Sequence, residues 1–261
     1  RVSGPSRKVL AAVDNSLAAN PVLVTARALA RAMGARVEAI HVRSAQEEAP
    51  ARAAAAVGVP LRVVDGDVVE RLREATADAD TAALVIGGRS SPSSPRALGS
   101  TALAVVTSCS RPVVVVPVAG RTAPILRKVL VPLEGAVSTS LAPRSIVELA
   151  RNANIEVVAL HVDEDGSAPD DDEFLRRFCP WGIGYVTLER RSGRREDLIP
   201  AVADELGCDV IALGWSQELA PGRAEVVRAT LERSPLPVIL IPASLETAQE
   251  PSALSVGGAE R

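Results

Sequence analysis

Aromatic side chains are almost absent from this sequence. Its 261 residues include only five, which are Phe174, Phe178, Trp181, Tyr185 and Trp215. The net charge is −3 and the pI about 5.6, so the chain lacks the positive charge that holds a nucleic-acid backbone. With so few aromatic side chains it also lacks platforms on which bases could stack. We therefore expect no nucleic-acid binding. The core must come from Val, Leu, Ile and Ala, which are typical of buried parallel strands covered by helices.

Metal ligands and long apolar runs are scarce as well. The chain has three cysteines without CxxC spacing, Cys109, Cys179 and Cys208, and two histidines, His41 and His161. This set is too small for a structural zinc site or a disulfide framework, and it favours a reducing compartment. The longest apolar runs are too short to span a bilayer, and no signal-like segment opens the chain. The sequence thus predicts a cytoplasmic protein without membrane contact.

An internal repeat organises the chain. Several blocks recur in the same order at offsets of 120 to 127 residues. Four of these pairs are Arg7–Ser16 with Arg127–Ala136, Val37–Val42 with Val157–Val162, Ala82–Gly88 with Asp209–Trp215, and Ser110–Pro117 with Pro235–Pro242. A shared order of this kind indicates two copies of one domain.

The repeat sets the expected domain boundaries. They are an N-terminal extension at 1–6, domain 1 at 7–119, a linker at 120–126, a degenerate domain 2 at 127–243 and a disordered tail at 244–261. In each copy strand-length apolar runs alternate with helix-length stretches, which predicts parallel strands joined by right-handed crossovers. The predicted fold class is α/β, with two tandem open parallel five-stranded sheets and helices on both faces.

The expected strands and helices follow from these runs. The strands are Lys8–Val13, Arg36–Val42, Leu61–Val64, Ala83–Gly87 and Val113–Val116 in copy one, and Lys128–Leu133, Glu156–Val162, Gly184–Leu188, Asp209–Leu213 and Val238–Ile241 in copy two. The helices of copy one are Pro21–Met33, Gln46–Val57, Val68–Ala77 and Ser100–Ser108.

The loops after the first and fourth strands are the expected ligand-binding loops, because open parallel sheets bind ligands where the strand order reverses. The first loop carries Asp14, whose carboxylate can accept from an adenine amino group or a ribose hydroxyl. The second starts at Gly87 and ends at Gly99, where a helix begins. Glycines let backbone N–H groups approach phosphate, and a helix N-terminus favours an anion. Arg89 adds positive charge.

The same loops also have a purely structural interpretation. Ser100 is typical of a helix N-cap, and Gly87 of a tight turn after a strand. Asp14 and the residues that follow it are equally typical of a helix start. Both interpretations remain open at the level of the residues.

A family resemblance favours the first interpretation. The first strand ends in VDNS and the second in AIHV, and DADTAALVIGGRS…LGSTALAVVTSCSRPVVVVP follows. In order and spacing, these segments resemble the universal stress protein family from about Arg7 to Pro242. The resemblance implies the adenine-nucleotide α-hydrolase-like fold and a stress-response protein that binds ATP or AMP, with or without Mg²⁺. The binding residues that it implies are Asp14, Val42, Gly87, Arg89, Gly99, Ser100 and Thr101.

The chain also departs from the pattern G-x2-G-x9-G-[ST] of the family's binders. Ser90 stands where the second glycine is expected, and the loop to Gly99 is one residue short and contains two prolines. In copy two Glu134 replaces the aspartate, and Ala224-Glu225 stand where copy one has Gly99-Ser100. An alignment through Gly222 restores one glycine but breaks the spacing to the last strand. We therefore expect a nucleotide site in domain 1 only.

The sequence favours binding without catalysis. His41 and His161 occupy equivalent strand ends without a nearby nucleophile, which indicates a structural role, and no adenylylation motif is found. The alternative is a nucleotide-free interaction or scaffold protein of the same fold, including a regulatory module of a larger protein such as a transporter. The final strands have exposed edges in isolation, and the resemblance implies a pseudo-dimer contact between Val113–Val116 and Val238–Ile241. A homodimer remains open.

Overall fold

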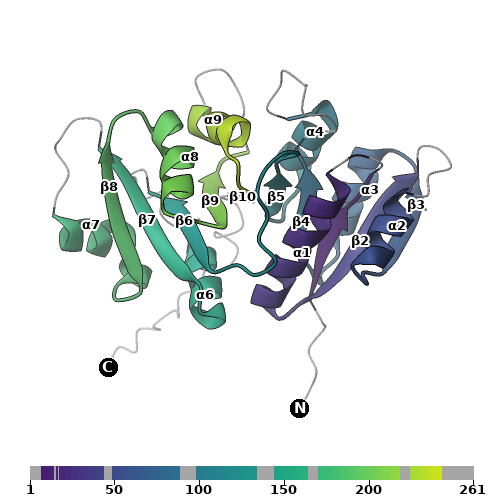
Figure 1. Ribbon diagram of the computed structural model, residues 1–261, viewed down its shortest axis with the longest axis horizontal. Helices are drawn as coiled ribbons and strands as arrows, with labels where there is room; N and C mark the ends of the chain where they lie inside the picture. The colour runs from purple at the N-terminus through teal and green to yellow at the C-terminus, as the bar shows by residue number, and fades with distance from the viewer. Residues whose placement is uncertain are drawn as a thin grey trace, which may run out of the picture.

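A computed structural model describes residues 7–14, 16, 18–43, 49–88, 98–133, 144–163, 170–217 and 224–242. Ten strands form one continuous sheet in the order β3-β2-β1-β4-β5-β10-β9-β6-β7-β8 (Figure 1). Several sequence predictions lie outside the described residues. They concern Arg89, Ser90 and the rest of the loop to residue 97, Glu134, Gly222, the extension at 1–6 and the tail at 244–261.

Both copies contain the elements that the repeat predicts. The strands are β1 Lys8–Ala12, β2 Arg36–Arg43, β3 Leu61–Asp65, β4 Thr81–Gly87, β5 Val113–Val116, β6 Lys128–Pro132, β7 Glu156–Asp163, β8 Val186–Ser192, β9 Val210–Trp215 and β10 Val238–Pro242. The helices are α1 Ala19–Met33, α2 Ala49–Ala56, α3 Val68–Ala77, α4 Ser100–Ser108, α6 Arg144–Ala153, α7 Asp171–Phe178, α8 Arg195–Glu205 and α9 Glu225–Arg233, with a 3₁₀ turn η1 at Pro180–Gly182.

The two halves have the same topology. In the first half β1 lies between β2 and β4, and in the second half β6 lies between β7 and β9. Pairing within each half is parallel, whereas β5 and β10 pair antiparallel through Val113–Val115 and Val238–Leu240. We call this pairing the seam. It is the contact between final strands that the sequence predicts, and it joins the two five-stranded sheets into one.

Helices cover both faces of the sheet, which confirms the predicted fold class. One face packs α1, α2, α6 and α7 against apolar side chains of both halves. The other packs α3, α4, α8 and α9. Strands such as β5, whose four valines are all buried, are apolar on both sides because each side meets a helix layer. Each layer of the core therefore continues across the seam.

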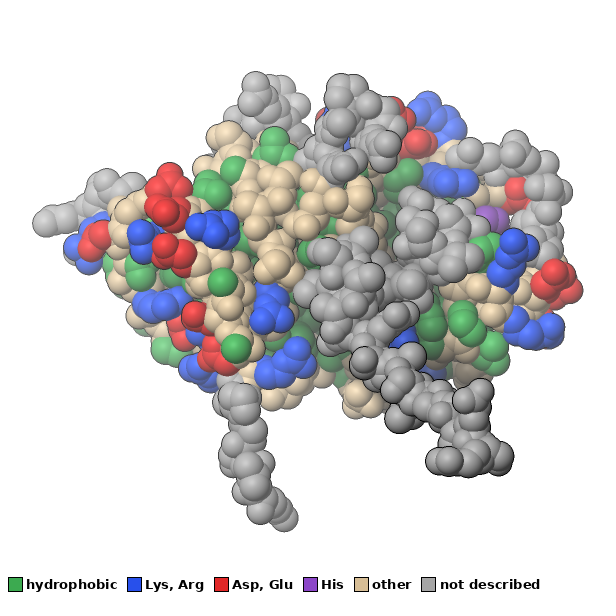
Figure 2. Space-filling view, turned by 180° about the vertical axis from the view of Figure 1, so that it is seen from behind, with side chains coloured by type: hydrophobic (Ala, Val, Ile, Leu, Met, Phe, Trp, Pro, Cys, Tyr) green, Lys and Arg blue, Asp and Glu red, His purple; other side chains and the backbone are tan. Residues whose placement is uncertain are grey.

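The edge strand β8 differs from its predicted bounds. It was expected at Gly184–Leu188 but runs from Val186 to Ser192 and thus includes a charged stretch. Its arginines form ion pairs with carboxylates of neighbouring helices. Arg190 pairs with Asp171 of α7, and Arg191 Nη2 lies 3.0 Å from Glu205 Oε1 of α8. Charged side chains are tolerated in an edge strand, and they protect it from pairing with another chain. Basic and acidic side chains are interspersed across the rear face as well (Figure 2).

Candidate functional site

A cleft opens at the carboxyl edge of the first half, where the strand order reverses. β2 and β3 lie on one side of β1, and β4 and β5 lie on its other side. The cleft between these strand ends measures about 590 Å³. Pockets for small molecules commonly measure roughly 300–1,000 Å³. We call this cavity the first-half cleft.

The structure brings the predicted site residues together. Those within the described residues all line the first-half cleft, and they are Asp14, Val42, Gly87, Gly99, Ser100 and Thr101. They come from the ends of β1, β2 and β4 and from the start of α4. Arg89 lies outside the described residues, so its place relative to the cleft stays a prediction.

The start of α4 forms one side of the cleft. Gly99 is the N-cap of α4 and has no side chain that could form a capping hydrogen bond. Ser100 is the first helical residue and is exposed. The interpretation of Ser100 as N-cap is therefore wrong by one residue. The Gly99 N–H donates to Gly88 O at 2.8 Å, and Leu103 N–H donates to Gly99 O at 2.9 Å. The first N–H groups of a helix have no intrahelical acceptor, so this end of α4 can donate to an anion.

Gly99 lines the cleft, and its backbone conformation does not require a glycine. Its φ of −64° suits any residue. A Cβ added there would meet only Gly88 O, at 3.8 Å. A Cβ at this position would thus make no close contact with the described residues.

Asp14 is exposed in the loop between β1 and α1. Its Oδ1 accepts from Ser16 N–H at 2.9 Å, and Ser16 Oγ accepts from Ala18 N–H at 3.1 Å. These bonds fix the loop just before α1. One carboxylate oxygen is thereby engaged, and Oδ2 can accept a hydrogen bond from a ligand.

The two histidines have the equivalent structural roles that the repeat predicts. His41 is buried, and its Nδ1 lies 2.8 Å from Val13 O, while His161 Nδ1 lies 3.2 Å from Leu133 O. A carbonyl oxygen only accepts, so each Nδ1 carries the hydrogen and donates. His41 therefore holds the residue that directly precedes Asp14, a positioning role that the sequence reading missed.

Apolar walls of the cleft were also missed from the sequence. They are Ile40, Val68, Leu72, Ile86 and Val105. Gly88 lines the cleft as well, and a Cβ there would lie 3.1 Å from Val115 Cγ1. A comparison of the two repeats could have identified Val68 and Gly88. The residues 127 positions after them are Arg195 and Trp215, which are much larger.

The corresponding place in the second half has a much smaller cavity among the described residues. The cavity bounded by Pro132, Leu160, Leu213 and Gly214 measures about 20 Å³. Arg195 lines it where the first half has Val68. Trp215, which stands in place of Gly88, ends β9 with only 5% of its surface exposed. The second half thus has a buried indole where the first half has a glycine.

The start of α9 supports the alignment of Ala224-Glu225 with Gly99-Ser100. Ala224 is the N-cap of α9, and Glu225 is its first residue. Arg228 N–H donates to Ala224 O at 2.9 Å, which repeats the bond from Leu103 to Gly99. A carboxylate therefore stands at the helix end that would otherwise attract phosphate.

The cysteines and the acidic run near Asp170 have structural surroundings. All three cysteines are free and buried, and burial raises the pKa of Cys179 and of Cys208 to about 11. The acidic run near Asp170 begins α7, since Asp170 Oδ1 accepts from Glu173 N–H at 2.9 Å. Among the described residues no group of three or more His, Cys, Asp or Glu side chains could hold a metal ion. No helix in the described part of the chain is long and apolar enough to cross a membrane.

Residues 43–117 match the model of the Universal stress protein family. This part of the chain is similar to a universal stress protein domain. The matched residues include β3, β4, α4 and β5, and with them the α4 side of the first-half cleft. The family resemblance predicted from the sequence is thereby confirmed. No curated protein sequence matches the chain.

Solved structures show the fold of the tandem pair. A universal stress protein from Archaeoglobus fulgidus DSM 4304 aligns at 18% identity with a TM-score of 0.69, covering 92% of this chain and 100% of that one. A functionally unknown protein from Pseudomonas aeruginosa PAO1 aligns at 12% identity with a TM-score of 0.66, covering 93% and 95%. The cytoplasmic domain of a prokaryotic cation chloride cotransporter aligns at 9% identity with a TM-score of 0.56, covering 94% and 98%. The two-copy universal stress protein fold therefore extends over both halves.

Proposed function

We propose that the first-half cleft binds an adenine nucleotide such as ATP or AMP, and that the chain is a nucleotide-responsive protein without chemistry of its own. The observation that carries the proposal is the contrast between the two halves. The cleft measures about 590 Å³ in the first half, and the corresponding cavity about 20 Å³ in the second. One nucleotide per chain follows.

The lining residues fit the parts of a nucleotide. The start of α4, with Ser100 and Thr101, offers backbone N–H groups and hydroxyls to phosphate oxygens. Asp14 Oδ2 can accept from the adenine amino group or a ribose hydroxyl. Val42 and Ile40 offer an apolar wall to the base. Magnesium, when bound, would screen the phosphate charge. Among the described residues that line the cleft, Asp14 is the one whose carboxylate could hold it.

Binding without catalysis fits the hydrogen bonds of the polar side chains. Nucleophilic catalysis needs a hydroxyl or thiol beside an oriented base. His41 Nδ1 is engaged by Val13 O, and Ser16 Oγ accepts from Ala18 N–H. These bonds orient the loop before α1. A slow loss of bound ATP to ADP in the presence of the wild-type chain, abolished by Asp14→Ala, would refute this part.

Calorimetric titration of the full chain with ATP and with AMP, with and without Mg²⁺, tests the proposal. We expect saturable binding of one nucleotide per chain, and a loss of tenfold or more in affinity for Asp14→Ala. The matched control is Asp65→Ala, which removes an exposed carboxylate at the end of β3 that does not line the cleft. Absence of binding at millimolar nucleotide, or equal losses in both variants, would contradict the proposal.

One observation favours the second candidate, a nucleotide-free partner-binding module. The described residues that line the first-half cleft include no lysine or arginine, so among them only backbone N–H groups and hydroxyls face phosphate charge. The likeness to the cytoplasmic domain of a cotransporter is compatible with such a role in a larger protein. The same titration separates the candidates, because a partner-binding module predicts no saturable heat with either nucleotide.

A further inference from the structure

Helix α4 links the first-half cleft to the second half of the molecule. Its first residues line the cleft, and nine residues of helix place its other end roughly 13 Å away. That end is Cys109, the C-cap, which is 1% exposed. Thr76 Oγ1 of α3 donates to Cys109 Sγ at 3.5 Å. The far end of α4 is thus held within the core of the first half.

A side chain from the second half reaches this end of α4. Gln217 Nε2 donates to Cys109 O at 2.7 Å, although the two residues are 108 positions apart. Gln217 follows β9, and its φ is 62°. A non-glycine residue in this left-handed region costs roughly 1–2 kcal/mol of backbone energy. The fold keeps this strained backbone at the position from which the amide reaches α4.

Gln217 belongs to the second half's counterpart of the ligand loop. It lies 127 residues after Ser90, at the offset that also relates Gly88 to Trp215. At the corresponding strand ends of its own half, the described residues enclose a cavity of about 20 Å³. Gln217, the counterpart of a residue in the predicted ligand loop, therefore contacts α4 of the first half.

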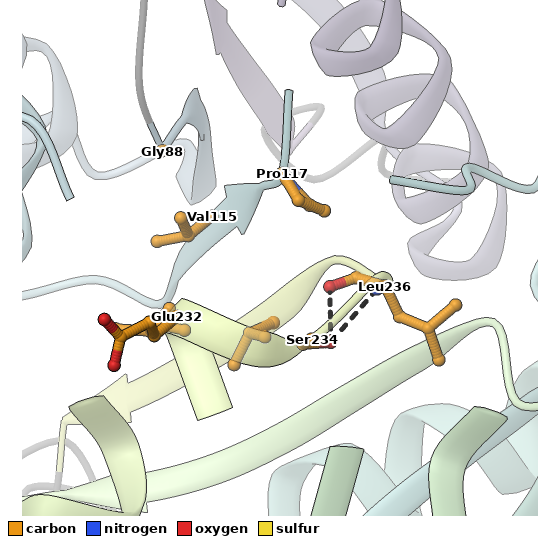
Figure 3. Close-up of a pocket in the computed structure, with 8 residues that line it drawn as sticks. Gly88, Val115, Pro117, Glu232, Ser234 and Leu236 are labelled. Carbon is orange, nitrogen blue, oxygen red and sulfur yellow. Dashed lines mark hydrogen bonds between the residues drawn. The ribbon is translucent and has the colours of Figure 1, made fainter. Parts of the chain in front are cut away.

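The cleft end of α4 is held by contacts within the first half. Gly88 O accepts from Gly99 N–H, and Gly88 N–H donates to Val116 O at 2.9 Å. Figure 3 shows Gly88 and Val115 on one side of a small seam cavity, with Ser234 and Leu236 of the second half on the other. The Cys109 end of α4 is thus held by a side chain from the second half, and its cleft end by backbone bonds that lead to β5.

We propose that Gln217 is a positioning residue for the first-half cleft. By holding the Cys109 carbonyl it fixes α4, and through α4 the N–H groups that start the helix. The inference rests on the proposed nucleotide site and adds that the degenerate half tunes that site without touching the ligand. Hydrogen bonds weaken steeply when their geometry shifts, so a small displacement of α4 lowers affinity.

The test compares Gln217→Gly and Gln217→Ala with Arg121→Ala. Glycine relieves the left-handed backbone while removing the amide, so the thermal midpoint should not fall. Arg121→Ala removes a different contact to the second half, from Arg121 Nη2 to Asp204 Oδ1 at 2.7 Å, and leaves α4 untouched. For Gln217→Gly we expect faster amide hydrogen exchange in α4 of the ligand-free chain and a three- to tenfold weaker AMP affinity. For Arg121→Ala we expect neither change.

Two outcomes for Gln217→Gly overturn the inference and leave the proposed function intact. They are unchanged exchange in α4 of Gln217→Gly, and unchanged AMP affinity despite faster exchange. Equal losses of affinity in Arg121→Ala would also overturn it, since any contact between the halves would then suffice. A wild-type chain that binds no AMP overturns the proposed function and this inference with it, so the two failures are distinguishable.

Discussion

A carboxylate at the start of α4 should move stability and nucleotide affinity in opposite directions. Ser100→Glu gives the first half the residue type that opens α9, where Glu225 is the first helical residue. Ser100 is exposed, and α4 has no acidic residue in its first turn. An acidic residue there stabilises a helix by roughly 0.3–1 kcal/mol through the dipole. The substitution should therefore leave the free energy of unfolding unchanged or raise it slightly.

The expected loss of affinity follows from charge repulsion. Two unit charges about 4 Å apart repel by roughly 4 kcal/mol at an effective dielectric constant of about 20. Solvent at this exposed position weakens the repulsion, and halving it leaves about 2 kcal/mol. At about 1.4 kcal/mol per tenfold, AMP affinity should fall roughly 30-fold. The loss should shrink at high salt.

Calorimetry with AMP and urea denaturation would be run on the wild type, Ser100→Glu and Ser100→Gln. The glutamine variant has the same size without the charge, and it should bind within a few-fold of the wild type. The reasoning is refuted if Ser100→Glu binds AMP as tightly as the wild type, or if Ser100→Gln loses as much affinity as Ser100→Glu.

Three further predictions concern the scaffold. Ile239→Ala at the seam, where Ile239 is 4% exposed, should lower the free energy of unfolding in urea by about 2–4 kcal/mol, whereas Ile183→Ala, at 53% exposure, should change it little. Burial opposes the charge on Lys8, but hydrogen bonds to Asp78 and Asp80 outweigh it and raise the pKa of Lys8 above 10.5. The stabilisation is therefore complete below pH 10.5 and is lost at higher pH, and Lys8→Met should flatten that alkaline decline in denaturation experiments. All three thiols are buried, so a thiol reagent at pH 8 should react with them only as the chain unfolds, and rapid reaction of the native chain would contradict this burial.

Much of the fold could be predicted because the same pattern of apolar runs occurs in both copies of the repeat. Each apolar run in one copy has a counterpart in the other, and strand ends agree with the structure within about two residues at most positions. β8 is the exception, because charged side chains in an edge strand resemble a loop in the sequence. The seam was also predictable, since Val113–Val116 and Val238–Ile241 would otherwise expose apolar strand edges.

The candidate site was only partly predictable. Asp14, Gly99 and Ser100 carry recognisable chemistry, and the order of the strands brings them to one cleft. Val68 cannot be recognised as a cleft residue from the first copy alone. Its role becomes recognisable only when it is compared with Arg195, the corresponding residue of the second copy. Gln217 was missed because its contact depends on a left-handed backbone and on a carbonyl 108 residues away. Neither is encoded in local sequence patterns.

The seam lies within a single chain, and this has a consequence for how the molecule responds to dilution. Two separate copies joined through their last strands would come apart as their concentration falls. Here the linker keeps β5 beside β10 at a high effective concentration, whatever the abundance of the protein. One copy can then lose its cleft, as Trp215 and Glu225 indicate, while the other keeps its own. The saturation curve of such a chain should be hyperbolic and independent of protein concentration.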